Sequence, residues 1–110
     1  MNTVYNVKYY ETENGERPFQ EWLDSLKDIT GRAKVHIRID RARLGNFGDT
    51  NSVGEGVHEL KINYGPGYRI YYALDGKRLI LLLFGGDKSK QSRDINQAKA
   101  YWKDQKRRKR

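Results

Sequence analysis

This sequence of 110 residues contains no cysteine, so neither a disulfide framework nor a thiolate metal site can form. Long hydrophobic runs are also missing. The longest, Leu79 to Phe84, falls far short of the roughly 20 apolar residues that cross a bilayer. The first residues lack the basic and then apolar pattern of a signal peptide. We therefore expect a soluble protein of the cytoplasm.

Negative charge is scarce outside the start of the chain. The net charge is +8, from 22 basic and 14 acidic residues. Residues 1–30 hold three basic and six acidic residues, so the remaining eighty carry a net charge of +11. This imbalance favours a polyanionic partner that meets one side of the molecule. A charged surface without any such partner would have the same composition.

The length fits one domain. We expect that domain over residues 1–105, because the last residues, "KRRKR", are basic and contain nothing apolar. The sequence therefore predicts a disordered basic tail over residues 106–110, which either stays solvated or contacts phosphate groups.

Apolar periodicity predicts strands and helices in separate blocks. Pro18 suits a first helical turn, and Phe19, Trp22, Leu23 and Leu26 follow at helical spacing. The Asp75-Gly76 pair predicts a hairpin turn. The expected order is a strand over 4–10, helices over 17–28 and 30–44, a loop over 45–56, strands over 57–62, 68–74 and 78–84, and a final helix that includes Ile95, Ala98 and Trp102. The last strand is apolar on both faces, which is typical of a strand covered on both sides. This β-α-α-β-β-β-α order, with strands and helices segregated, predicts an α+β fold with a small, mainly antiparallel sheet packed with helices.

One strand, "YRIYYAL", carries an arginine among tyrosines and isoleucine. Alternate residues of a strand share a face, so Arg69 and Tyr71 should point away from the main core. The preceding strand places Glu59 and Lys61 on the same face. We expect these four side chains on the open face of a hairpin, as a cationic site with one aromatic ring. An ordinary surface with cross-strand ion pairs, and an arginine stacked on tyrosine, is the alternative.

Two further groups of basic residues accompany this hairpin. Lys88 and Lys90 follow the next strand, just before the last helix. Three basic residues of the second helix, Lys34, Arg38 and Arg41, recur at i, i+4 and i+7 and should line one face. A plain solvated face would give the same pattern.

The segments "GEGVHELKINYGPGYRIYY" and "GGDKSKQSRDINQAKAYW", with an apolar strand between them, resemble the RelE/HigB superfamily of bacterial toxins. The similarity is greatest to the addiction-module killer proteins, or phage Gp49-like group, and includes "RPFQEWLDSL" near the start. The resemblance implies a RelE-like fold and a toxin that cuts messenger RNA on the ribosome. It also implies neutralisation by a cognate antitoxin, typically a helix-turn-helix DNA-binding protein.

The resemblance implies roles for particular residues of this sequence. Arg69 matches the arginine that contacts the scissile phosphate, and Lys61 matches a basic strand position implicated in catalysis. Lys88 and Lys90 fall where related toxins hold the leaving-group side, and the basic face of the second helix matches a surface that grips ribosomal RNA. Glu59 departs from the family, since some members have a second basic residue there. Asp94 and Ile95 occupy the region where some members have a catalytic tyrosine.

RNA cleavage by the 2′-hydroxyl needs a base, charge stabilisation on the phosphorane and an acid for the leaving oxygen. The planar guanidinium of arginine can donate hydrogen bonds to two phosphate oxygens at once, which suits Arg69 to charge stabilisation. A lysine among other cations can act as general base, so we assign that role to Lys61, with Glu59 as the competing candidate. Tyr71 would stack on a base, and Lys88 or Lys90 would assist the leaving oxygen. Carboxylates at metal-ligand spacing are missing, so we expect no metal or other cofactor.

Two other functions fit the same fold. Toxins of the ParE group resemble RelE in shape but poison DNA gyrase. A non-catalytic module that binds nucleic-acid backbone is the other alternative.

Overall fold

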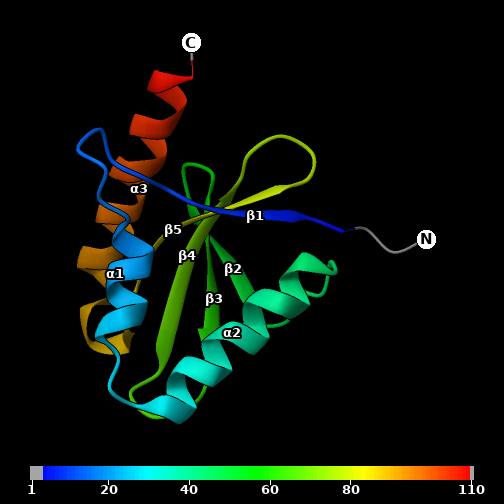
Figure 1. Ribbon diagram of the computed structural model, residues 1–110, viewed down its shortest axis with the longest axis vertical. Coiled ribbons are helices and arrows are strands. Elements are labelled where there is room, and N and C mark those ends of the chain that lie inside the picture. Colours follow the sequence, from blue (N-terminus) through cyan, green and yellow to red (C-terminus); the bar gives the residue numbers. More distant parts are fainter. Residues whose placement is uncertain (1–3, 110) are drawn as a thin grey trace.

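Five strands form one mixed sheet in the order β1-β5-β4-β3-β2 (Figure 1). The computed structural model describes residues 4–109. The elements are β1 (Asn6–Tyr9), α1 (Pro18–Ser25), α2 (Ile29–Arg43), β2 (Thr50–Gly54), β3 (Val57–Ile62), β4 (Tyr68–Leu74), β5 (Leu79–Asp87), the short 3-10 helix η1 (Lys88–Lys90) and α3 (Gln91–Arg108). β1 runs parallel to β5, and the other neighbouring strands are antiparallel. The predicted α+β class is confirmed.

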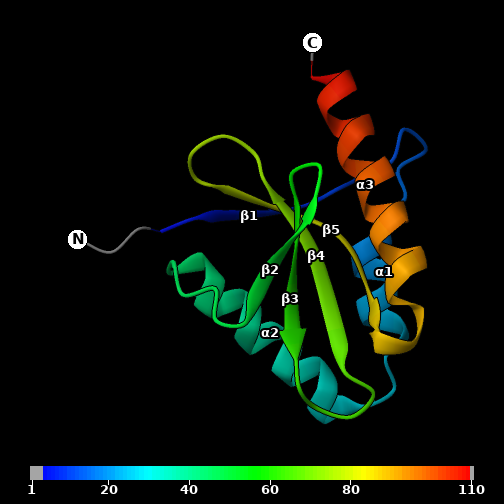
Figure 2. The same ribbon diagram turned by 180° about the vertical axis from the view of Figure 1, so that it is seen from behind.

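Helices cover both faces of the sheet. α1 and α2 lie on one face, and α3 lies on the other, as the two opposite views show (Figures 1 and 2). Each face has its own hydrophobic core, because alternate residues of a strand point to opposite sides. The molecule is therefore built as helix, sheet and helix layers.

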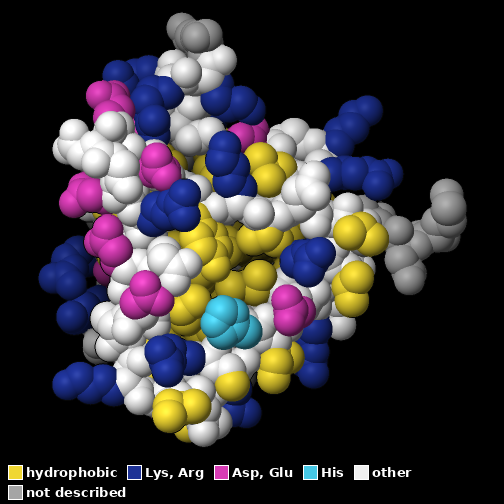
Figure 3. All heavy atoms as spheres, viewed as in Figure 1, with side chains coloured by type: hydrophobic (Ala, Val, Ile, Leu, Met, Phe, Trp, Pro, Cys, Tyr) yellow, Lys and Arg dark blue, Asp and Glu magenta, His cyan; other side chains and the backbone are white. Residues whose placement is uncertain are grey.

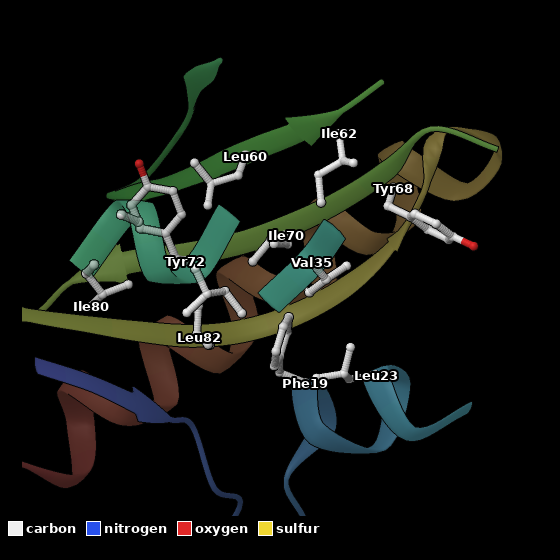
Figure 4. Close-up of a cluster of buried hydrophobic side chains, with 12 residues drawn as sticks. Phe19, Leu23, Val35, Leu60, Ile62, Tyr68, Ile70, Tyr72, Ile80 and Leu82 are labelled. Atoms are coloured by element: carbon white, nitrogen blue, oxygen red, sulfur yellow. The ribbon is translucent and has the colours of Figure 1, made fainter. Parts of the chain in front are cut away.

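The larger core lies between the sheet and the first two helices (Figure 4). Phe19 of α1 and Val35 of α2 are fully buried against Ile70 of β4. The amphipathic spacing read from the sequence produces this contact, since it places the apolar stripe of α1 on the strands.

The second core lies under α3, where Ala98 and Trp102 pack on Leu81 and Leu83 of β5. Ile80 and Leu82, on the opposite face of the same strand, belong to the larger core. β5 also has a paired strand on each side. The prediction that this strand is covered on both faces is therefore confirmed.

The first two helices are separated by a sharp boundary. Asp28 caps α2, because its carboxylate accepts a hydrogen bond from the Gly31 amide at 3.1 Å. α1 consequently ends at Ser25, before the predicted residue 28. Gly31 lies in the first turn of α2, where a Cβ would lie 2.7 Å from the Tyr68 ring.

The loop expected over residues 45–56 contains a strand, so that prediction is wrong in part. β2 pairs antiparallel with β3 through a two-residue turn, Glu55–Gly56, in which both residues have positive φ. β2 lies at the edge of the sheet, and its residues Thr50, Asn51 and Ser52 are polar and mostly exposed. It therefore has no apolar alternation in its sequence.

The C-terminal segment also differs from expectation. α3 continues to Arg108, so residues 106–108 are helical and not a disordered tail. Arg107 and Arg108 both bond to Asp104, one turn earlier, and basic residues in a last helical turn are favoured by the helix dipole. Residue 110 lies outside the described residues. Within residues 4–109, no helix is both long and apolar enough to cross a membrane.

Two consecutive glycines let helices approach β5 from both sides. A Cβ on Gly85 would lie 2.1 Å from the Trp22 ring of α1, and one on Gly86 would lie 2.0 Å from an Asp94 carboxylate oxygen of α3. Neither position tolerates a side chain at these distances. The "GG" of the "GGDK" motif is thus a packing requirement.

We expect Gly85→Ala to lower the free energy of unfolding in urea by about 1–3 kcal/mol, because the added methyl group overpacks the contact with Trp22. The double variant with Trp22→Leu should recover part of that loss relative to Trp22→Leu alone. Additive effects of the two substitutions would contradict direct contact as the cause.

Candidate active site

The register of β3 and β4 brings the predicted hairpin residues together. Lys61 pairs with Arg69, and Glu59 pairs with Tyr71. All four belong to the face on which α3 lies, as Tyr71 packs in the core under that helix. The predicted shared face is therefore confirmed.

The prediction that this face is open is wrong. Glu59, Arg69 and Tyr71 are 3%, 6% and 0% exposed. The first turns of α3 cover them, and Gln91 donates a hydrogen bond to the Glu59 carboxylate at 2.9 Å. A nucleotide base cannot stack on Tyr71 in this arrangement, so that proposed role is withdrawn.

Arg69 is a buried cation without an ion pair among the described residues. One terminal nitrogen donates to the carbonyl oxygens of Gly67 and Tyr68, at 3.0 and 3.1 Å. The Nε atom is buried and has no hydrogen-bond partner. Burying an arginine usually requires an anion beside it, because desolvation of an unpaired charge is costly. The guanidinium therefore has a free hydrogen-bond donor and an unpaired charge with which to bind an anion.

The Tyr71 hydroxyl is the second buried polar group without a partner. Burial and then the negative charges of Glu59 and Asp94 raise the pKa of Tyr71 well above its usual value. The phenol therefore stays protonated at neutral pH and has an unused hydrogen-bond donor. Tyr71 lies two residues after Arg69 in β4, on the same face of the sheet.

Asp94 was not among the predicted site residues, but it lies next to them. Its carboxylate sits over Gly86, which is the register partner of Arg69. Asp94 is 4% exposed, and burial raises the pKa of its carboxyl group. The sequence contained a signal: Asp94, Ala98 and Trp102 recur every four residues, so a charged residue occupies the apolar stripe of the helix.

Lys61 is the more accessible of the two candidate bases. Its side chain is 30% exposed, whereas that of Glu59 is 4% exposed. The Lys61 Nζ atom lies 3.9 Å from a Glu59 carboxylate oxygen, and 2.9 Å from the Asn51 side-chain oxygen when that amide is oriented to accept. Glu59 is therefore placed to position Lys61 and not to reach a substrate.

Lys88 and Lys90 lie on η1, at the entrance to α3. Both are exposed, and the segment from Lys88 to Arg93 lines a shallow cavity of about 460 Å³. Asp87 holds this turn, because its carboxylate accepts hydrogen bonds from the Ser89 hydroxyl and amide, which lower the pKa of Asp87. A Cβ on Gly67 would contact both Arg69 and Lys88 at 3.4 Å, so η1 adjoins the arginine.

The basic residues of α2 divide into two kinds. The guanidinium of Arg38 donates to the carbonyl oxygens of Lys61, Phe47 and Asp49, at 3.1, 3.0 and 3.3 Å. Arg38 therefore fastens the segment before β2 to β3. Lys34 and Arg41 are exposed and line a groove of about 330 Å³ that also includes Lys61. The predicted basic face is present with two accessible members.

Taken together, the cluster offers a buried guanidinium, a half-buried lysine, a neutral phenol and two exposed lysines. These groups can bind an anion and transfer a proton. Among residues 4–109, no group of three or more His, Asp or Glu side chains is arranged to hold a metal ion.

Comparison with known proteins gives one clear relationship. No protein-family model matches the chain. A protein of Haemophilus influenzae (strain ATCC 51907 / DSM 11121 / KW20 / Rd) is 49% identical over 81 residues, which cover 74% of this chain and 82% of the relative. This chain belongs to the same family as that protein. The relative is described as an uncharacterized protein.

We expect Tyr71→Phe to leave the free energy of unfolding unchanged or to raise it by up to about 1 kcal/mol, since it removes a buried hydroxyl without a partner. Tyr72→Phe is the matched control on the opposite face, because the Tyr72 hydroxyl lies 2.9 Å from that of Thr50. That control should lose about 1 kcal/mol in the same urea titration. Equal losses in both variants would show that the Tyr71 hydroxyl has a partner.

The raised pKa of Asp94 predicts a pH dependence. The unfolded chain loses this proton near the ordinary value of 3.8, before the folded protein does, so Asp94 lowers stability as pH rises through its raised pKa. The stability of the wild type relative to Asp94→Asn should fall over that interval and then remain constant.

Asp104→Asn provides a control of opposite sign for the same measurement. The hydrogen bond from Tyr10 is the largest cause of the lowered pKa of Asp104, so that carboxylate adds stability as pH rises toward 3.8. Urea titrations at a series of pH values measure both differences. The same slope for both variants would contradict the burial argument for Asp94.

Proposed function

We propose that this protein is the toxin of a toxin–antitoxin module, with a RelE-like fold, that cleaves messenger RNA on the ribosome without a metal ion. The observation that carries the proposal is the buried guanidinium of Arg69. It has no carboxylate partner, and its Nε atom has no hydrogen-bond acceptor within residues 4–109. A phosphodiester supplies the missing anion and accepts the unused hydrogen bond.

The cleavage step uses groups that surround this arginine. Lys61 removes the proton of the 2′-hydroxyl, and the oxygen attacks the adjacent phosphorus. Arg69 stabilises the charge of the phosphorane. The bond to the 5′-oxygen breaks, and Lys88 or Lys90 donates a proton to that oxygen. The products are a 2′,3′-cyclic phosphate and a 5′-hydroxyl.

Two buried residues support these groups. Glu59 positions Lys61, with Gln91 holding the carboxylate from the other side. Tyr71 donates its unused hydroxyl hydrogen toward the bound phosphate. Because Arg69 is 6% exposed under the first turns of α3, the substrate must displace the start of that helix together with η1, whose Lys88 lies near the arginine. The ribosome supplies the remaining positioning of the message, which can contribute several kcal/mol.

Accessible cations extend the proposed RNA surface beyond the cleavage point. Lys34 and Arg41 line a groove on the α2 side of the sheet that extends to Lys61, whereas the Lys61 side chain lies on the α3 side. RNA bound at Lys61 would therefore pass around the end of β3 to meet them. The partner that controls the toxin is a cognate antitoxin, of the helix-turn-helix DNA-binding type.

Mapping of 5′ ends in a translated reporter message, after brief induction, tests the proposal. Wild type should create new ends at in-frame positions. Arg69→Ala should reduce their rate of appearance roughly a hundredfold or more, because it removes a transition-state contact. Lys77→Ala, which removes an exposed charge at the β4–β5 turn, should cut normally.

Circular dichroism and thermal unfolding of each variant separate loss of activity from loss of fold. If Arg69→Ala does not fold, Lys88→Ala provides the second test, since Lys88 is exposed. Growth arrest with DNA breaks and intact messages would indicate a gyrase poison. RNA binding without new ends would indicate a non-catalytic module.

A further inference from the structure

A hollow of about 300 Å³ lies between α1 and α3, and none of the residues of the candidate active site lines it. β1 accompanies β5 only as far as Leu82, so the next part of β5 meets the two helices instead of a strand (Figures 1 and 2). The walls come from the segment before α1, from α1, from β5 and from α3: Glu16, Pro18, Glu21, Trp22, Phe84 and Tyr101. Ligand pockets span roughly 300–1,000 Å³, so this hollow has room for one side chain but not for a nucleotide.

Three aromatic side chains form most of these walls. The rings of Phe84 and Tyr101 lie edge to face, with their centroids 5.8 Å apart. The Trp22 ring packs against Gly85, the residue after Phe84, so the backbone of β5 fixes its position. All three side chains are only half-buried. Aromatic rings that meet at a hollow and stay partly in water can bind a cation, because the faces of the rings carry negative charge density.

Two carboxylates complete the hollow. Glu16 and Glu21 are exposed, and within residues 4–109 neither makes an ion pair. Burial and then the negative charges of these two residues raise the pKa of Tyr101, so both carboxylates lie close to its phenol group. Among the described residues, no lysine or arginine lines the hollow, in contrast to the cavities beside Lys88 and Lys34. The hollow is therefore locally acidic in a protein with a net charge of +8.

The acidic start of the sequence accounts for this reversal of charge. Residues 1–30 hold six acidic residues against three basic ones, and two of the six line the hollow. Figure 3 shows acidic side chains gathered on the side of the molecule where α1 lies. RNA is a poor occupant, because the carboxylates would repel its phosphate groups. The charge favours a basic partner.

Among basic groups, a guanidinium fits these walls best. It is planar, stacks on aromatic rings and can donate two hydrogen bonds to one carboxylate, whereas an ammonium group is a more strongly hydrated point charge. We propose that this hollow is a docking site for one arginine side chain of a basic partner protein. The guanidinium contacts the aromatic rings, and its N–H groups donate to Glu16 and Glu21. The site goes beyond RNA cleavage and does not depend on it.

The test uses the full chain and capped five-residue peptides that have one central arginine between glycines and serines. NMR follows the indole N–H signal of Trp22, which the spectrum of Trp22→Phe identifies. We expect the peptides to shift this signal at about 1–10 mM, since one cation–π contact with one ion pair supports only weak binding. Citrulline keeps the length and the planar end but lacks the charge, so citrulline peptides should bind about tenfold more weakly. Lysine peptides should bind about threefold more weakly than arginine peptides.

Substitutions in the protein separate the carboxylates from the rings. Glu21→Gln should weaken binding about threefold, because it removes one ion pair. Asp24→Asn removes an equal charge from the same helix outside the hollow, so it should leave binding unchanged. Tyr101→Leu removes a ring and should weaken binding about threefold, whereas Tyr101→Phe keeps the ring and should bind like the wild type. Circular dichroism checks the fold of each variant, and Glu21 is exposed, so its replacement does not disturb the core.

Several results would overturn the proposal. They are an unchanged Trp22 signal with every arginine peptide up to about 10 mM, a weak limit for a specific contact; equal binding of arginine and citrulline peptides; and equal effects of Glu21→Gln and Asp24→Asn. Lysine peptides that bind as tightly as arginine peptides would overturn the choice of a guanidinium. A shift of the Trp22 signal with rising protein concentration alone would assign the hollow to an arginine of a second copy of the chain. A shift produced by a short single-stranded RNA, but not by the peptides, would assign it to nucleic acid.

Discussion

The close approach of helices to both faces of β5 is the contact on which the rest of the molecule depends. Gly85 admits the indole ring of Trp22, and Gly86 admits the carboxylate of Asp94, each at a distance that a methyl group would occupy. This contact fixes the start of α3 over the β3–β4 hairpin. Because α3 lies there, Glu59 and Arg69 become part of the interior, while Lys61 stays partly exposed.

Burial changes what those side chains can do. An arginine on an open strand face is solvated and needs no partner, whereas Arg69 under α3 has lost water without gaining a carboxylate. The same helix leaves the Tyr71 hydroxyl without an acceptor and raises the pKa of Asp94. These groups are costly to hold in the interior, and in the proposed activity an incoming phosphate would relieve part of that cost. The proposed activity therefore depends on the unpaired guanidinium and hydroxyl that packing leaves in the interior, at a site that η1 borders.

The two edge strands of the sheet, β1 and β2, differ in the polarity of their side chains. β2 is polar, carries no large apolar side chain except the half-buried Val53, and ends in a tight turn. β1 is short, has an apolar side toward α2, and opens on a hollow with more cations than anions. Lys8 on such an edge discourages uncontrolled pairing between copies of the chain.

Local backbone geometry allowed the sequence by itself to determine the elements and the side on which each residue lies. The period of two in β3 and β4 placed Glu59, Lys61, Arg69 and Tyr71 together, and the helical period of α1 identified its buried stripe. The sequence did not predict β2, because an edge strand without an apolar face has no such period. Only the tertiary structure decided which face of the hairpin is covered. That depends on where α3 docks. The docking involves a hydrogen bond between Glu59 and Gln91, which are 32 residues apart, and a close approach of Asp94 to Gly86. Sequence periodicity encodes neither contact.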